Sequence, residues 1–283
     1  MLAPWNILAA MTQRAGELNE PDLMAQWPGF GISLFVLGLI ADVFLLLRWK
    51  QRRQVGPKPW GLSALFAALG VSVAIFLSVT IIGSLLRLNA ASLLVLLAGT
   101  ELTLLIILLF CLRLERIDWR AAFGLREYPA LHALAMGTVF FAAIQPPLVT
   151  LAWIRDTIYH ALGWKISTQD IVQMFLYTRS PWLSTFLVGF AVFVAPLCEE
   201  AFFRGLAYPA IKQRWGTVVA LCAVSGLFAL IHLHVPSLPL LFALAAGLAL
   251  AYEYTGSLLT PIMMHALFNL LNVAVILLYR AHP

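Results

Sequence analysis

Long apolar runs, each close to the length needed to cross a lipid bilayer, follow one another along most of this chain. A membrane-spanning helix needs about 20 predominantly apolar residues. The predicted spanning segments are residues 29–49, 61–86, 90–112, 131–154, 182–204, 217–232, 238–254 and 258–279. We therefore expect an all-α fold, a polytopic transmembrane bundle of about eight spanning helices. Residues 155–181 have mixed polarity, and we expect them to form either a simple connection or an amphipathic element lying over the bundle.

The composition supports a surface that faces lipid. Apolar residues make up 62% of the 283 positions and charged residues only 11%, with a mean hydropathy of +0.91. A soluble domain carries roughly a quarter charged residues, so this chain has too few charges to cover a water-facing surface. The net charge of +5 does not indicate nucleic-acid binding, because the basic residues lie between apolar runs, where membrane topology places them. The expected partners are membrane lipid and no nucleic acid.

The distribution of basic residues also predicts an orientation. The loops after the first, third and fifth segments are the richest in Lys and Arg, which places them on the cytoplasmic side and both termini outside. The N-terminus begins with an apolar stretch but lacks the basic region and the small-residue cleavage site of a signal peptide, so we expect it to be retained.

Ionisable residues inside the apolar segments are informative because they are costly at bilayer depth. Asp42 and Glu101 each stand alone in their segments. Asp42 lies near the end of its segment, and Glu101 is suited to capping a helix break or meeting a partner helix. Neither residue is assigned a catalytic role.

The fifth segment contains a denser group of charges in Cys198-Glu199-Glu200-Ala201-Phe202-Phe203-Arg204. Residues four apart share a helix face, so Glu200 and Arg204 can pair with each other. Glu199 is turned by about 100° from Glu200 and gains no such partner. A buried carboxylate with few counter-charges has a raised proton affinity, which suits a general base near neutral pH.

Two later segments add imidazoles. His232 shares a helix face with Phe228, and His265 shares one with Asn269. A single histidine of this kind is more often a satisfied core residue than a catalyst. However, Glu199 and His232 lie 17 and 16 residues on either side of a predicted turn at Gly216, so an antiparallel pair of helices would bring them level.

Peptide hydrolysis requires a base that activates water and donors that hold the developing oxyanion. Glu199 with His232 is suited to the first task, and His265 with Asn269 to the second. A water-filled cavity must reach these side chains, because they cannot face lipid.

The three motifs together resemble the type II CAAX prenyl endopeptidase family, also called CPBP (CAAX proteases and bacteriocin-processing enzymes). That family is marked by Glu-Glu-x-x-x-Arg, Phe-x-x-x-His and His-x-x-x-Asn on successive membrane helices. Here they read as Glu199 to Arg204, Phe228 to His232 and His265 to Asn269, in that order. The similarity covers residues 184–278, and the stretch from Trp119 to Leu125 resembles a segment often found upstream.

The resemblance implies an intramembrane glutamate-dependent endopeptidase acting on membrane-associated protein or peptide substrates. It implies that Glu199 and His232 activate water, that His265 and Asn269 form the oxyanion hole, and that Glu200 and Arg204 support the site. No obligatory cofactor is expected. Zinc remains an alternative, with Glu199, His232 and His265 as its ligands, because Glu and His are common zinc ligands.

With this resemblance the chain divides into four parts, and we expect it to reside in a bacterial cytoplasmic membrane. The parts are an extracytoplasmic segment (1–28), three spanning helices with a cytoplasmic loop (29–128), a fourth spanning helix with its loop (129–182), and the catalytic helical domain (183–279).

The sequence also allows two other functions. A rhomboid-like serine protease would use Ser225 with His265, but it would leave Glu199, Glu200 and Arg204 without a purpose. A non-catalytic scaffold or transporter would use the buried charges for assembly or proton movement. Substitution of Glu199 or His232 distinguishes that alternative from an enzyme.

Overall fold

The computed structural model describes residues 28–126, 128–167 and 169–281, and within these ranges the chain is helical and contains no strand. The predicted all-α bundle is confirmed. The predicted extracytoplasmic segment, apart from Pro28, lies outside the described residues.

The helices follow the apolar runs closely. The α-helices are α3 (Pro28–Arg48), α4 (Leu62–Leu85), α5 (Ala90–Leu114), α6 (Trp119–Ala122), α7 (Ala130–Ala143), α8 (Gln145–Ala161), α9 (Asp170–Tyr177), α10 (Pro181–Gly189), α11 (Ala195–Glu200), α12 (Tyr208–Ile231), α13 (Leu238–Thr255) and α14 (Leu259–Ala281). The other helical turns are the 3-10 helices η1 (Trp49–Gln51) and η4 (Val235–Ser237) and the π-helices η2 (Phe190–Val194) and η3 (Ala201–Ala207).

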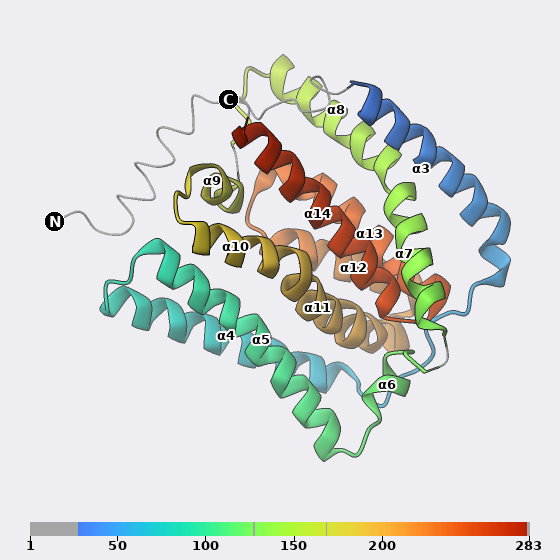
Figure 1. Ribbon diagram of the computed structural model, residues 1–283. Coiled ribbons are helices and arrows are strands. Elements are labelled where there is room, and N and C mark those ends of the chain that lie inside the picture. The colour runs from blue at the N-terminus through green and yellow to red at the C-terminus, as the bar shows by residue number, and fades with distance from the viewer. Residues whose placement is uncertain (1–27, 127, 168, 282–283) are drawn as a thin grey trace.

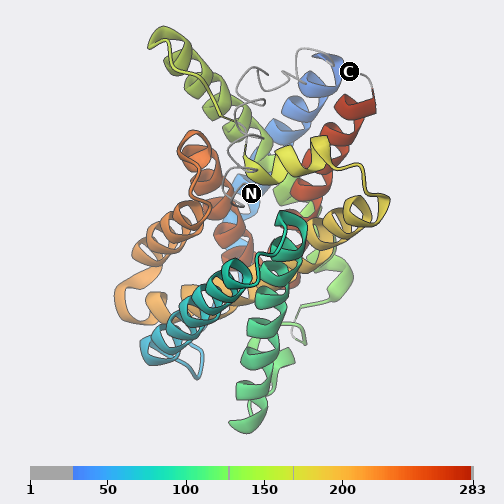
Figure 2. The ribbon, with the colours of Figure 1, turned by 90° about the vertical axis from the view of Figure 1, so that its left-hand side faces the viewer.

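Seven helical runs in the described part are long and apolar enough to cross a membrane, where eight segments were predicted. The predicted fifth and sixth segments form a single run, Pro181–Ile231. This run is divided at Gly216, whose φ of 83° is a backbone conformation that favours glycine. The part of this run after Gly216 then turns back and lies beside the part before Gly216, as Figure 2 shows. The turn predicted at Gly216 is therefore present.

The predicted fourth segment is bent. It consists of α7 and α8, which meet at Ile144. Pro146 and Pro147 follow at once, and proline removes a backbone donor and crowds the preceding turn, which accounts for the bend.

The stretch 155–181 is largely helical rather than an open loop. α8 continues to Ala161, and α9 forms a separate short helix. Phe175 of α9 is buried together with Leu183, Leu187 and Val273, so α9 packs its apolar face onto the bundle. Of the two alternatives for this stretch, the structure therefore shows an amphipathic element.

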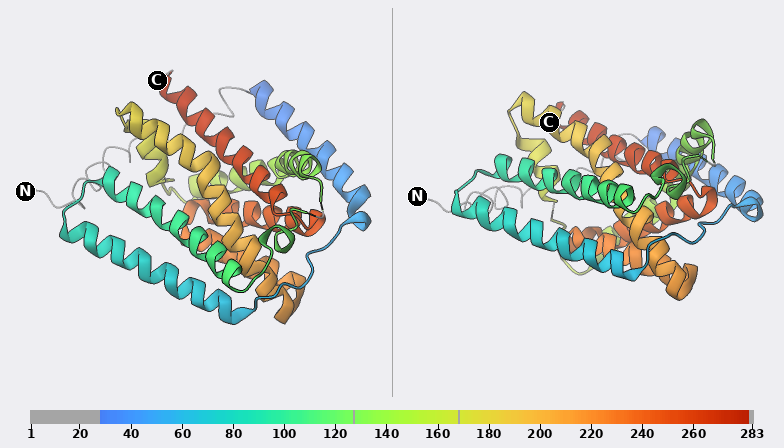
Figure 3. Two further views of the ribbon diagram at one scale, coloured as in Figure 1. Left: turned by 60° about the horizontal axis from the view of Figure 1, so that its bottom comes forward. Right: turned by 90° about the horizontal axis from the view of Figure 1, so that it is seen from below.

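The C-terminal helices form the centre of the molecule. In Figures 1 and 3, α11 to α14 lie between two outer groups, with α3, α7 and α8 on one side and α4 and α5 on the other. The pairs in contact include α12 with α13, α14 with α7, and α5 with α11. The apolar side chains of α3 and α4 are mostly exposed, as expected for helices that face lipid.

The stretch from Trp119 to Leu125 packs directly against the central helices. Phe123 is buried, and its carbonyl accepts a hydrogen bond of 3.0 Å from the Leu258 amide. Gly124 has φ of 69° and lies against the backbone carbonyl of Gly256, where a side chain would collide. Gly205 of η3 leaves room for the Phe123 ring in the same way. This upstream segment is therefore part of the same packing unit as the motif helices.

A group of polar contacts joins the loop after α3 to the start of α12 and the end of α13. The Glu253 carboxylate accepts a hydrogen bond of 2.5 Å from the Val55 amide and pairs with Lys212. Lys212 also donates to the Val55 carbonyl at 2.8 Å. One carboxylate and one ammonium thus hold three separate stretches of the chain together.

Candidate active site

The helix that carries the two adjacent glutamates is interrupted by π-helical turns on both sides. η2 precedes α11, and η3 follows it. Each π turn ends just before a proline, Pro196 or Pro209. A proline ring clashes with the carbonyl four residues earlier, and the wider π turn moves that carbonyl away. π-Helical turns are rare and occur frequently at functional sites.

Glu200 and Arg204 form the buried pair that their spacing predicted. The Arg204 Nη1 donates to Glu200 Oε1 at 2.8 Å, and both side chains are fully buried. His265 Nδ1 lies 2.9 Å from the same oxygen. Because two cationic or N–H donors converge on one oxygen, Glu200 is an ionised acceptor and His265 Nδ1 carries a hydrogen.

Arg204 has further partners that the sequence did not reveal. Its Nη2 donates to the Ala245 carbonyl of α13 at 2.8 Å. Its guanidinium carbon lies 5.0 Å from the ring centre of Phe228 and 5.9 Å from that of Phe203. Arg204 therefore ties η3 to α12 and α13 as well as neutralising Glu200.

Glu199 is left with an unused oxygen. Its Oε2 is buried and has no hydrogen-bond partner in the described part of the chain, although the side chain as a whole is 20% exposed. The nearest imidazole is His265, whose Nε2 lies 3.9 Å from Glu199 Oε2. This separation is too long for a direct hydrogen bond and is of the kind that a bridging water spans.

His232 contacts Phe228, one helical turn earlier in the chain. Its Nδ1 lies 2.7 Å from the Phe228 carbonyl and its ring is 4.8 Å from the Phe228 ring. That His232 stands level with Glu199 stays a prediction. The Phe228 ring is also 5.9 Å from the ring of His265. Phe228 thus contacts both imidazoles. The imidazole that comes within 3.9 Å of Glu199 is that of His265.

Asn269 lies one turn beyond His265 on α14. Its Nδ2 donates to the Ala191 carbonyl of η2 at 2.8 Å, and the second hydrogen of this amide is not used by that bond. Asn272 only bonds back to Phe268 of its own helix and is exposed. The structure therefore links Asn269, and not Asn272, to the helix that bears Glu199.

The structure does not bring together the side chains that a serine protease or a zinc site would need. Ser225 is fully buried, and its Oγ has no hydrogen-bond partner among the described residues, while His265 Nδ1 is bonded to Glu200. Within the described ranges, no three His, Cys, Asp or Glu side chains are grouped so that they could hold a metal ion. The set Glu199, His232 and His265 accordingly does not fit a zinc site in this arrangement.

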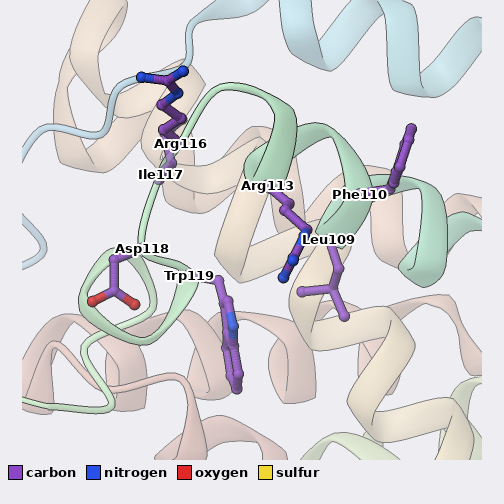
Figure 4. Close-up of a pocket in the computed structure, with 7 residues that line it drawn as sticks. All are labelled: Leu109, Phe110, Arg113, Arg116, Ile117, Asp118 and Trp119. Atoms are coloured by element: carbon purple, nitrogen blue, oxygen red, sulfur yellow. The ribbon is translucent and has the colours of Figure 1, made fainter.

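The motif residues do not line either of two pockets on the outside of the molecule. One pocket, of about 530 Å³, lies where α5 ends, and Arg113, Arg116 and Trp119 are among its lining residues (Figure 4). The other, of about 480 Å³, is lined mainly by aromatic residues of α10 and η2, including Trp182 and Phe193. The charged site instead lies between α11, α12 and α14.

Comparison with known proteins agrees with the motifs. Residues 181–271 match the family described as type II CAAX prenyl endopeptidase Rce1-like. No curated protein and no solved structure matches the chain. The matched region begins at the start of α10 and contains every motif residue from Glu199 to Asn269. The chain is thus an integral multi-pass membrane protein whose residues 181–271 are similar to the Rce1-like type II CAAX prenyl endopeptidases.

Proposed function

We propose that the protein is an intramembrane endopeptidase in which Glu199 is the general base. The observation that carries this proposal is the difference between the two adjacent glutamates. Glu200 is neutralised by Arg204 and bonded to His265, whereas Glu199 presents a buried oxygen that has no hydrogen-bond partner among the described residues. Membrane-embedded charges of this kind mark functional sites by default.

The proposed reaction begins with a water held between Glu199 Oε2 and His265 Nε2. Glu199 takes a proton from this water as its oxygen bonds to the carbonyl carbon of the substrate peptide. The Nδ1 of His232 is directed at the Phe228 carbonyl, which leaves Nε2 to accept the second hydrogen of the water.

The tetrahedral intermediate then needs donors for its oxyanion. In this proposal His265 carries hydrogens on both ring nitrogens from the start and supplies its Nε2–H, and Asn269 supplies the amide hydrogen that it does not use on Ala191. Glu199 returns its proton to the leaving nitrogen as the carbon–nitrogen bond breaks. All atoms and protons are accounted for without a metal ion.

We further propose that no metal ion is obligatory. His265 Nδ1 is committed to Glu200, and within the described residues Glu199, His232 and His265 are not grouped closely enough to hold a metal ion. Chelation should therefore leave cleavage unchanged. Loss of activity on chelation, restored by added zinc, would contradict this part of the proposal.

The proposed substrates are membrane-associated proteins or peptides, and the proposed location is a bacterial cytoplasmic membrane. Supporting the substrate class, the family description refers to prenylated CAAX proteins, which are membrane-bound. The site lies between helices that are apolar enough to cross a bilayer, so a substrate already in the membrane reaches it most directly.

Glu199→Gln and His232→Ala test the proposal. Quantitative proteomics of membranes carrying the wild-type chain or a variant should show uncut substrates accumulating with each variant. Asp42→Asn and His160→Ala serve as matched controls, because Asp42 lies on α3 and His160 is exposed on α8, both outside the motif helices. Immunoblotting should show equal insertion of all five proteins.

Full activity of both Glu199→Gln and His232→Ala would contradict the proposed endopeptidase function. That result would favour the non-catalytic alternative, in which the buried charges serve assembly or proton movement.

A further inference from the structure

Glu101 of α5 is a partly buried acid that the proposed mechanism does not use. It lies in a helix that packs against α11, the helix of Glu199. In Figures 1 and 3, α5 runs alongside α10 and α11. Glu101 Oε2 is buried and has no hydrogen-bond partner in the described part of the chain. A carboxyl group placed in this way at bilayer depth requires an explanation.

The periodicity of α5 shows which way Glu101 faces. Ala98 and Leu112 are buried, and Leu105 and Leu108 pack against the core cluster that includes Phe203. The positions 98, 101, 105, 108 and 112 recur at intervals of three and four residues and so form a single stripe. Glu101 therefore belongs to the inward face of α5, next to the helix of the two glutamates.

Of the two long helical runs packed against α5, only the one that contains α11 carries titratable side chains near Glu101. α4, the other long helix packed against α5, contains no titratable side chain. α11, which packs against α5, contributes Cys198, Glu199 and Glu200. The guanidinium of Arg204, on the helical run that continues from α11, is committed to Glu200. Two neighbouring buried carboxyls without a free cation between them cannot both ionise at neutral pH.

We propose that Glu101 is a third acid of this site, a positioning residue that stays protonated and shares its proton with Glu199. Glu199 is the ionised partner, because His265 lies 3.9 Å from it. Glu101, by contrast, has only apolar neighbours on its own inward stripe. The neutral Glu101 carboxyl donates toward Glu199, directly or through a water, and fixes the orientation of the base. This inference rests on the proposed role of Glu199.

Infrared spectroscopy tests the protonation state without any substrate. The full chain in phosphatidylcholine vesicles, labelled with carbon-13 glutamate, should show a protonated carboxyl band at pH 7 that shifts with the label. Glu101→Gln should remove this band, and Asp42→Asn should leave it unchanged. The other described glutamates inside the bundle, Glu200 and Glu253, are paired with cations and should not contribute. Absence of the band in the wild-type protein, or its survival in Glu101→Gln, overturns the inference.

Kinetics then test the positioning role, with a prenylated CAAX-type peptide as the probe. Glu101→Leu should lower kcat about 10- to 100-fold with KM unchanged, the effect expected for losing a hydrogen bond to a charged group. Glu101→Gln keeps a neutral donor of the same shape and should retain activity within about threefold. Wild-type kcat in Glu101→Leu, or equal loss in both variants, contradicts the role. If the wild-type chain does not cleave this peptide, the proposed function fails for that substrate, while the infrared result still decides the state of Glu101.

Discussion

Replacing Arg204 by methionine removes a buried guanidinium while keeping most of its apolar stem. The wild-type guanidinium bonds to Glu200 and to the Ala245 carbonyl and packs against the Phe228 ring. Glu200 is fully buried and would be left with His265 as its remaining partner. The variant therefore strands a carboxylate and a backbone carbonyl in the centre of the bundle.

The expected loss of stability is about 3–5 kcal/mol, the range for removing one partner of a buried ion pair. The Ala245 carbonyl accounts for about 1–3 kcal/mol of this if it finds no other donor. Protonation of Glu200 limits the loss. Removing both charges in Glu200→Gln/Arg204→Met should recover at least about 2 kcal/mol relative to the two single variants summed, because neighbouring residues in one network are strongly coupled.

Unfolding in mixed detergent micelles, followed by tryptophan fluorescence, measures these free energies. Arg214→Met is the matched control, because Arg214 is an exposed arginine on the same helical run. It should change stability by less than about 0.5 kcal/mol. A loss below about 1 kcal/mol in Arg204→Met, or additive single and double variants, would show that the pair does not form the closed network described above.

Two further substitutions test the packing that surrounds the site. Gly124→Ala should destabilise the protein more than Gly163→Ala, because both glycines have positive φ but only Gly124 faces a carbonyl, that of Gly256. We expect about 1 kcal/mol for the backbone strain alone and at least about twice that at Gly124, and equal effects in the same unfolding assay would contradict the close approach. Lys212→Met should release the loop around Val55, so that trypsin cleaves at Arg52 and Arg53 faster than in the wild-type chain. Cleavage at the wild-type rate, as expected for the control Lys50→Met at an exposed lysine, would show that Lys212 does not hold this loop.

The spanning helices could be predicted because lipid leaves the chain little choice. A backbone in hydrocarbon must satisfy its own hydrogen bonds, so an apolar run of sufficient length becomes a helix. α9 could not be predicted in this way, because its eight residues are far too short to span a bilayer. Its apolar face is explained only by the residues that pack against Phe175. The single helical run through Gly216 was likewise predicted as two segments, although the turn itself was located correctly.

Within the site, contacts along one helix were predictable and contacts between helices were not. The Glu200–Arg204 pair follows from a spacing of four residues. The bond from His265 to Glu200 depends on how α14 is rotated against α11, which no spacing within one segment determines. The π turns add to this difficulty, because each one shifts the helical phase of the residues that follow it. Pro196 and Pro209 are the sequence signals from which these turns could have been found.

Two adjacent residues of one helix have different roles: Glu200 stabilises the fold, and Glu199 is left for the proposed chemistry. Residues three and four positions from Glu199, namely Pro196, Ala195, Phe202 and Phe203, carry no charge, so its own helix cannot neutralise it. Glu200, one position later, meets Arg204 and is locked into the core. Because Glu199 Oε2 has no hydrogen-bond partner in the described part of the chain and its nearest imidazole is 3.9 Å away, its replacement by glutamine should cost little folding energy. The same change at Glu200 opens a buried network. Loss of activity without loss of stability is therefore the expected signature of Glu199 alone in this pair.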